Sequence, residues 1–205
     1  VATFIVCFFI YLVAVDINFL WLFGKSPSIT EIMNPKTNNA SYIYSADGKM
    51  IGKFYNENRT PVKFSEVSPS FFTALIDTED ERFYDHLGID IQGLFAAAKD
   101  MLVHGKSRGA STITQQLVKN MFRVRTQYST GLLGYIPGVK MLIMKTKEWI
   151  LATEIELVYH DKQRILEMYA NTVDFGNNAF GINTAARTYF NKKPSQLTVE
   201  ESSVL

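Results

Sequence analysis

Two neighbouring segments of the chain gather opposite charges. Between Asp77 and Asp90 the sequence has six acidic residues against the single Arg82, whereas Lys99 to Lys147 holds nine Lys and Arg residues and one acid, Asp100. The chain as a whole has a formal net charge of only +1. A carboxylate cluster beside a basic surface suits an anionic substrate that is acted on by a carboxylate base.

Glu79 is the candidate base within the acidic segment. A carboxylate becomes a better proton acceptor beside other acids and under partial burial, and it can then take a proton from a weakly acidic hydroxyl group. Asp77, Asp80 and Glu81 are the neighbouring acids, and we expect partial burial of Glu79. A solvated acidic turn that follows a helix is the alternative interpretation of the same run.

The sequence contains no pattern of metal ligands. His104 and His160 are the only histidines besides His86, and neither has ligand spacing to it. We therefore expect His86 to be a hydrogen-bonded orienting residue rather than a metal ligand. Cys7 is the only cysteine and lies in an apolar run, which excludes a disulfide framework and a cysteine metal site.

A helix is expected to begin directly after Thr112. Thr112 followed three residues later by Gln115 is a capping-box pattern, and apolar residues then recur at helical spacing. The N-terminus of a helix presents free backbone N–H groups and the positive end of a dipole, which suit a phosphate group. A simple capping role for Ser111 and Thr112 is compatible with this interpretation. The Gly-Lys-Ser/Thr ending of a nucleotide-binding P-loop is absent from the sequence.

A second expected helix, from 137 through 159, carries further lysines. Lys140 and Lys147 are seven residues apart and share one expected face, while Lys145 and Glu148 are three apart and share another. Fixed cations of this kind stabilise the negative charge that develops on an anionic leaving group. An ordinary solvated helix face is the alternative interpretation of the Lys-Thr-Lys-Glu run.

Four ordered motifs resemble those of the peptidoglycan glycosyltransferases, glycosyltransferase family 51. The first resembles E-D-x-x-F-x-x-H-x-G and is carried by Glu79, Asp80, Phe83, His86 and Gly88. The others resemble G-x-S-T-I-T-Q-Q at 109–116, R-K-x-K-E at 144–148 and I-L-E-x-Y-L-N at 165–171. This family supplies the front domain of class A penicillin-binding proteins and occurs alone in monofunctional transglycosylases. The resemblance covers residues 40–205.

The resemblance implies an activity and a set of site residues. The activity is polymerisation of lipid II into β-1,4-linked glycan, with inversion and release of the lipid diphosphate. Glu79 would deprotonate the acceptor's 4-hydroxyl group, and Glu148 would be a second catalytic carboxylate that positions the donor or a diphosphate-bound cation, Mg²⁺ or Mn²⁺. The implied substrate-binding residues are Asp80, Phe83, His86, Ser111, Thr112, Gln115, Gln116, Lys119, Lys140, Lys145 and Lys147. No nucleic acid partner is expected.

Some positions depart from the family pattern. The arginine that usually opens the third motif is Met144, and an arginine expected eight residues before the motif's glutamate is matched by Lys140. A lysine keeps the charge but loses bidentate geometry. In the fourth motif the usual Leu is Ala170, a change expected in the core. Structural roles are expected for Arg164, Glu167, Tyr169 and Asn171.

The elements that must position these residues follow from hydropathy and turn signals. Residues 1–23 are almost entirely apolar, and about 20 such residues span a bilayer, so we expect a single transmembrane anchor; a cleaved signal peptide is the alternative. Residues 24–40 are interpreted as a linker. Residues 41–66 are expected to form a β-hairpin around Asp47 and Gly48. From 67 to 205, apolar residues recur at helical spacing and predict the catalytic domain.

The expected fold is mainly α. The resemblance implies a lysozyme-like, two-lobed domain on the extracytoplasmic side of the bacterial cytoplasmic membrane. The segment 123–144 is irregular and apolar, so it suits the membrane surface, where it would admit a lipid tail; a hairpin packed on the core is the alternative. We expect the domain to continue beyond Leu205, and the resemblance implies cell-wall synthesis proteins as partners; the sequence leaves open whether a transpeptidase domain follows. A glycan-cleaving enzyme and a non-catalytic cell-wall scaffold stay open as rival functions.

Overall fold

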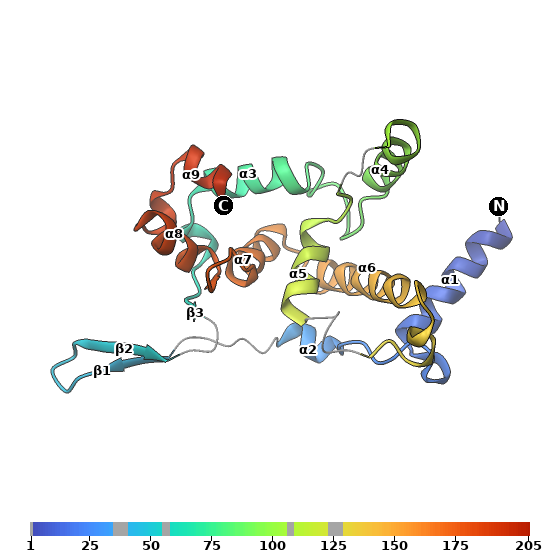
Figure 1. Ribbon diagram of the computed structural model, residues 1–205, viewed down its shortest axis with the longest axis horizontal. Coiled ribbons are helices and arrows are strands. Elements are labelled where there is room, and N and C mark those ends of the chain that lie inside the picture. The colour runs from blue at the N-terminus through green and yellow to red at the C-terminus, as the bar shows by residue number, and fades with distance from the viewer. Residues whose placement is uncertain (1, 35–40, 55–57, 106–108, 123–128) are drawn as a thin grey trace. The chain divides into compact units, whose positions relative to one another are not determined.

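The structure of the chain is a computed structural model that describes residues 2–34, 41–54, 58–105, 109–122 and 129–205 (Figure 1). The chain divides into two compact units. The first unit comprises 1–35 and 85–160, and the second comprises 36–84 and 161–205. Helices make up most of the described residues, which confirms the mainly α prediction.

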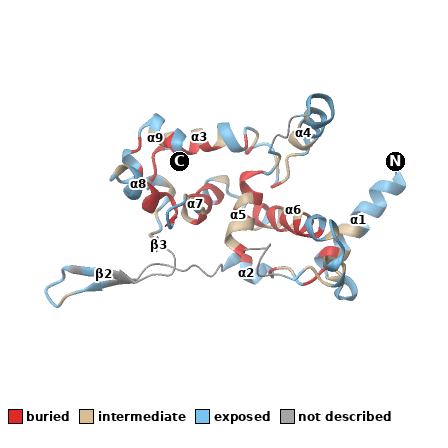
Figure 2. Cartoon of the chain, viewed as in Figure 1, coloured by how far each residue is buried: buried red, intermediate tan, exposed pale blue. Residues whose placement is uncertain are grey.

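The first unit is built around one long helix, α6 (Val139–Tyr159). This helix is contacted by α1, α2, α5 and the short 3-10 helix η3. The elements of this unit are α1 (Ala2–Asp16), η1 (Phe19–Trp21), α2 (Ile29–Met33), α4 (Ile91–His104), α5 (Ile113–Phe122), η3 (Leu132–Tyr135) and α6. Buried residues gather on α5 and α6, whereas α4 has none (Figure 2).

The packing of α5 on α6 follows from the spacing of their apolar residues. The exposed fraction is 0% for Ile113 and Leu117 on α5. On α6 it is 1% for Leu151 and 0% for Ile155. A spacing of four residues places each pair on one face of its helix. Full burial of such a side chain contributes about 1.5–3 kcal/mol. The contact therefore fixes the position of the second motif, at the start of α5, relative to the third motif on α6.

The second unit contains shorter helices and two small sheets. Its elements are β1 (Ser41–Tyr44), β2 (Met50–Phe54), β3 (Asn58–Arg59), η2 (Phe64–Glu66), α3 (Pro69–Glu79), α7 (Lys162–Thr172), β4 (Ala179–Phe180), α8 (Ile182–Phe190), η4 (Pro194–Gln196) and α9 (Val199–Val204). Proline at its first turn starts α3, and the Asp161 carboxylate caps α7 by accepting the Gln163 N–H at 2.9 Å. Helix α3 contacts α9, and α7 contacts η2 and α8.

The predicted hairpin is present but shorter than expected. β1 and β2 pair antiparallel with Ile43 opposite Gly52, and Gly48 has the positive φ of 79° that such a turn requires. The hairpin ends at Phe54 rather than at residue 66. Beyond it, β3 pairs in parallel with β4, a contact that was not predicted because strands of two residues have no detectable periodicity.

The N-terminal segment differs from the prediction of one continuous helix over 1–23. Helix α1 ends at Asp16, and Asn18 follows with a φ of 51° and accepts the Phe23 N–H on its side-chain oxygen at 3.2 Å. Fifteen helical residues extend about 22 Å, against about 30 Å for a hydrocarbon core. Among the helices that the structure describes, none combines the length and apolar character needed to cross a membrane.

The two irregular segments also contain more helix than predicted. Within the expected linker, α2 is started by a capping box in which Ser28 and Glu31 bond to each other's backbone N–H groups. In the expected loop 123–144, η3 occupies Leu132–Tyr135 and was not predicted, whereas α6 (Val139–Tyr159) agrees with the helix expected over 137–159. Residues 35–40 of the expected linker and 123–128 of the expected loop lie outside the described residues.

Candidate functional site

Glu79 is the last residue of α3 in the second unit, and its side chain is exposed. The prediction of partial burial is therefore wrong. The residues that follow Glu79 in the motif are buried instead: Asp80 is 6% exposed and Phe83 is fully buried. The Phe83 N–H donates to the Asp80 carbonyl at 2.8 Å, and the ammonium group of Lys162 lies 4.3 Å from the centroid of the Phe83 ring. Asp80 and Phe83 thus anchor the turn that ends α3 and leave Glu79 at its surface.

Tyr169 on α7 is electrostatically coupled to Glu79. The Tyr169 side chain is 5% exposed. Burial raises the pKa of Tyr169, and the negative charge of Glu79 raises it further. A structural role was expected for Tyr169, and its electrostatic interaction with the candidate base was not predicted. Its place in the fourth motif was the signal available in the sequence.

The second and third motifs meet at Lys145 in the first unit. The Lys145 ammonium group donates to the Ser111 hydroxyl at 2.9 Å and to the Gln115 side-chain oxygen at 2.7 Å, and it lies 3.4 Å from a Glu148 carboxylate oxygen. Glu148 is buried, at 2% exposure, whereas Lys145 remains 28% exposed. The structure therefore brings together four of the predicted site residues, with one cation that remains accessible.

Gly88 fixes the start of α5. Its carbonyl accepts the Thr112 hydroxyl at 2.8 Å and the Gln115 side-chain N–H at 2.9 Å, and its own N–H donates to the Nδ1 of His86 at 3.2 Å. This hydrogen bond is consistent with the orienting role expected of His86, which stays a prediction. Half of the predicted capping box is also present, because the Gln115 backbone N–H donates to the Thr112 hydroxyl at 3.2 Å, while the Gln115 side chain turns to Gly88.

A buried hydrogen bond between α5 and α6 was not predicted. The Thr114 hydroxyl group donates to a Glu156 carboxylate oxygen at 2.6 Å. Thr114 is fully buried, and the exposed fraction of Glu156 is 3%. Hydrogen bonds to a charged group are among the stronger ones in proteins. No motif contains Glu156, and a single glutamate in a helix carries no signal that it is buried.

Lys147 does not fit the diphosphate-binding role that was predicted for it. Its side chain is 1% exposed, and its ammonium group donates to the carbonyls of Gly24 at 2.9 Å, Lys25 at 2.8 Å and Ser129 at 3.0 Å. An ammonium group has three donors, so all of them are used. Burial lowers the pKa of Lys147 to about 8. Lys140 is exposed, so the two lysines do not share a surface as predicted.

The remaining predicted residues differ in accessibility. On α5, Gln116 and Lys119 are half-buried. On α6, Met144 is 5% exposed and so belongs to the interior of the unit. Residues of the fourth motif have structural contacts: Glu167 accepts the Phe64 N–H at 2.8 Å, and Asn171 bonds both the N–H and the carbonyl of Val62, at 2.9 Å and 2.7 Å.

The described residues do not form a metal site by themselves. They contain no group of three or more His, Cys, Asp or Glu side chains that would hold a metal ion. The carboxylate of Glu148 has the ammonium group of Lys145 beside it, and that positive charge opposes a cation at the same place.

Comparison with known proteins identifies the family. Residues 47–205 match the family described as Transglycosylase. The chain belongs to this transglycosylase family. Penicillin-binding protein 1A of Escherichia coli strain K12 is 38% identical to it over 180 residues, which cover 87% of the chain and 20% of that relative. Penicillin-binding protein 1F of Bacillus subtilis strain 168 is 40% identical over 167 residues, 81% of the chain and 21% of the relative.

The family match confirms the resemblance that the four motifs indicate. Penicillin-binding protein 1A of Haemophilus influenzae is 41% identical over 167 residues, with 80% of the chain and 18% of the relative covered. The transglycosylase chain therefore spans about a fifth of the length of these curated relatives. The matched region includes every residue predicted for the site.

Proposed function

We propose that this transglycosylase chain is a peptidoglycan glycosyltransferase that polymerises lipid II into β-1,4-linked glycan strands. The observation that carries the proposal is the contact of Lys145 with Ser111, Gln115 and Glu148, because it joins two of the family's motifs in one accessible cationic site. The family match over residues 47–205 supports the same conclusion. The fold that we propose for the whole domain is the lysozyme-like one implied by the motifs.

The proposed reaction transfers a lipid-linked glycan to lipid II. The 4-hydroxyl oxygen of the acceptor forms a bond to the anomeric carbon of the donor, from the face opposite the diphosphate, so the configuration inverts. The bond between that carbon and the diphosphate oxygen breaks, and its electron pair leaves with the diphosphate. Glu79 takes the proton of the acceptor hydroxyl group, a role that its exposure at the end of α3 permits.

We assign the donor diphosphate to the first unit. The ammonium group of Lys145 and the positive end of the α5 dipole supply positive charge where the leaving group becomes more negative. Lys140, which is exposed at the start of α6, and Lys119 and Gln116, on α5, complete the proposed binding set. Lys147 is excluded from this set because its three donors are occupied by carbonyls.

A divalent cation remains a proposal that concerns the donor rather than the protein. Because the described residues offer no cluster of metal ligands, oxygens of the diphosphate would have to supply most of the coordination. Glu148 is the carboxylate that the family resemblance assigns to such a complex, and the cation would have to share it with the ammonium group of Lys145, which lies 3.4 Å away. No step of the proposed reaction depends on the cation.

The surface of the first unit supports a location at the membrane. Phe19, Leu20 and Trp21 of η1 are 49–75% exposed, and Leu132 and Tyr135 of η3 are 63% and 86% exposed. Such large exposed apolar side chains mark lipid or partner contacts. We propose that the N-terminal segment anchors the chain in the bacterial cytoplasmic membrane with its catalytic residues outside. By analogy with the penicillin-binding relatives, a transpeptidase domain and other cell-wall synthesis proteins are proposed partners.

The decisive experiment measures polymerisation of lipid II by the parent and by Glu79→Gln. The variant keeps the shape of the side chain but removes the base, so product formation should fall to the background rate while binding of lipid II remains. Glu81→Gln, which changes an exposed acid in the same segment, is the matched control and should retain activity. Parent-like turnover by Glu79→Gln would disprove the assignment of the base.

The same assay separates the rival functions. Glycan strands that lengthen with time indicate the transferase, whereas strands that shorten indicate a glycan-cleaving enzyme. Binding of lipid II without any product from the parent protein indicates a scaffold.

A further inference from the structure

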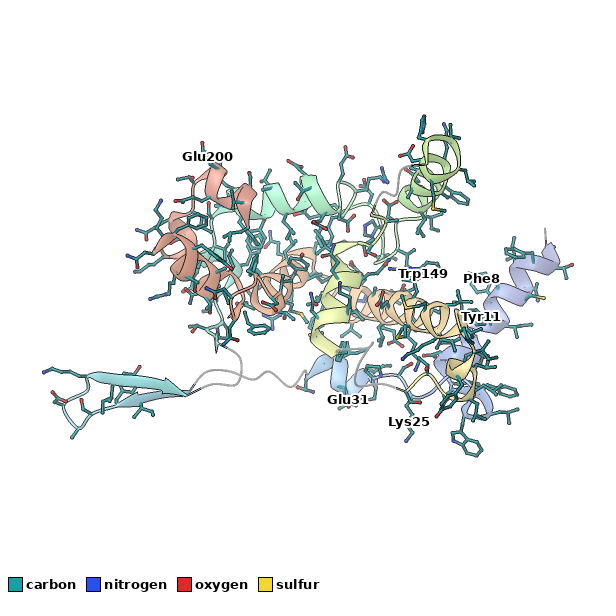
Figure 3. The ribbon with its side chains drawn as sticks, viewed as in Figure 1. Phe8, Tyr11, Lys25, Glu31, Trp149 and Glu200 are labelled. Atoms are coloured by element: carbon teal, nitrogen blue, oxygen red, sulfur yellow. The ribbon has the colours of Figure 1, made fainter. Side chains whose placement is uncertain are left out.

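Lys147 joins three parts of the first unit that are distant in sequence. Its carbonyl partners belong to Gly24 and Lys25, which follow η1, and to Ser129, which precedes η3 (Figure 3 labels Lys25). The ammonium group itself lies on α6. A buried ammonium group that donates three charge-assisted hydrogen bonds is strongly held in place, because moving it away would leave the ammonium group and the three carbonyls without these bonds in the interior.

The two segments that Lys147 holds also touch each other backbone to backbone. The Leu133 N–H donates to the Leu22 carbonyl at 3.0 Å. A Cβ atom added to Gly24 would lie 2.0 Å from the Ser129 carbonyl oxygen, and one added to Gly131 would lie 2.4 Å from the Leu22 carbonyl. Both glycines have positive φ angles, 75° and 64°. The approach of these segments is therefore possible only with glycine at both positions.

This junction supports the exposed apolar turns η1 and η3. η1 ends at Trp21, one residue before the first junction segment, 22–25, and η3 begins at Leu132, inside the second junction segment, 129–133. Two flexible turns would lose conformational entropy on binding lipid, and a fixed spacing removes part of that cost. The junction thus links a buried charge on α6 to the surface for which a lipid contact is proposed.

We infer that Lys147 is a positioning residue that fixes η1 and η3 at one spacing for engagement of the lipid part of the substrate, rather than a ligand of the diphosphate. The inference rests on the proposed glycosyltransferase function. Lys145, two residues earlier on α6, contacts Ser111 and Gln115 and is the diphosphate ligand in the same scheme. The neighbouring lysines of one motif therefore have separate tasks.

The first test measures the spacing without any turnover. Spin labels are placed on cysteines at the exposed positions 19 and 132, in a Cys7→Ser background, and their distance distribution is recorded for the parent, Lys147→Met and Lys147→Arg. We expect a narrow distribution for the parent, a broad one for Lys147→Met, and a narrow one again for Lys147→Arg, which keeps the charge and the donors. A distribution that stays narrow in Lys147→Met overturns the inference.

The second test compares the roles of the two lysines. Binding of inorganic diphosphate should weaken by at least about tenfold, or about 1.4 kcal/mol, in Lys145→Met, which loses a charge-assisted hydrogen-bond donor, but by less than about twofold in Lys147→Met. For turnover, Lys147→Met should raise the KM of a donor with a long polyprenyl tail and leave that of a short-tailed donor unchanged. Equal KM increases for both donors, or weakened diphosphate binding in Lys147→Met, contradict the positioning role.

Gly24→Ala provides a variant that leaves Lys147 intact. Its added methyl group must displace the Ser129 carbonyl and so opens the same junction. If Lys147→Met does not fold, Gly24→Ala should still broaden the label distance and raise the KM of the long-tailed donor alone. If the parent protein does not polymerise lipid II but the label distance still responds to these variants as predicted, the proposed function is disproved. The role of Lys147 in fixing the spacing of η1 and η3 is then retained.

Discussion

The hydrogen bond between Thr114 and Glu156 is expected to be a main determinant of how α5 is held on α6. Thr114 precedes Gln115, and Gln115 contacts Lys145 on α6, so a shift between the helices moves the two halves of the candidate site apart. Thr114→Val removes the hydroxyl group and keeps the shape of the side chain. The carboxylate of Glu156, at 3% exposure, then loses one donor in a place that water does not reach.

The expected loss of stability follows from the type of bond removed. A hydrogen bond to a charged group contributes about 1.5–3 kcal/mol to stability. The methyl group that replaces the hydroxyl group cannot form this bond, so Thr114→Val should lower the free energy of unfolding by about 2 kcal/mol. Urea denaturation followed by tryptophan fluorescence measures this change, because both tryptophans, Trp21 and Trp149, belong to the first unit. The denaturant dependence, m, should stay the same.

A matched control and a double-mutant cycle test the reasoning. Thr153 donates to the carbonyl of Trp149 within the same helix and is half-buried, so Thr153→Val should change stability by less than about 0.5 kcal/mol. Combined with Glu156→Gln, Thr114→Val should show a coupling energy of at least about 1 kcal/mol. A loss no greater than that of Thr153→Val, or no coupling, would refute the view that this bond holds the helices in register.

Three further predictions use other features of the structure. Gly88→Ala should lower the free energy of unfolding by at least about 2 kcal/mol, because the φ of Gly88 is 83° and the new Cβ atom would lie 2.7 Å from the α6 backbone. Gly48→Ala is the control, since Gly48 has a similar φ of 79° but no atom within 4 Å of the new Cβ. In the same denaturation assay it should lose only about 1 kcal/mol. Burial and the charge of Asp16 raise the pKa of Glu154, so the folded state binds this proton more tightly than the unfolded state. The stability that this proton contributes is lost as the pH rises above 4.5. In thermal denaturation, Glu154→Gln should therefore be more stable than the parent at pH 7 but not at pH 4. Met144→Arg places a cation at a site that is 5% exposed, so it should lower the free energy of unfolding by about 3 kcal/mol without raising the affinity for inorganic diphosphate. Titrations of diphosphate at two salt concentrations test this, and a tenfold, salt-sensitive gain in affinity would contradict it.

The grouping of the second and third motifs could be predicted from the sequence because it depends on local rules. Thr112 and Gln115 mark a helix start, and Lys145 and Glu148 are separated by three residues and therefore share a helix face. The family motifs then indicate that these two local arrangements meet. The structure places the Lys145 ammonium group within 3.4 Å of oxygens of Ser111, Gln115 and Glu148.

The N-terminal segment shows why hydropathy did not predict its structure. Its composition is that of a membrane span, but hydropathy does not record where a backbone turns. Asn18 adopts a left-handed conformation, and its side chain accepts the Phe23 N–H, which ends the helical path. Asparagine tolerates this conformation better than most residues, so Asn18 was the available signal.

Lys145 and Lys147 show the limit of motif-based prediction at the site itself. Residues two apart on a helix point in directions about 200° apart, so helical geometry alone predicts that these two lysines meet different surroundings. It does not predict which of them is buried, because the partners of Lys147 are backbone carbonyls, and a carbonyl is present at every position of every sequence. The segments that supply these carbonyls lie up to 123 residues away along the chain. A basic residue in a catalytic motif is therefore evidence of a ligand only when its donors remain available, and in the third motif that condition distinguishes Lys145, at 28% exposure, from Lys147, at 1%.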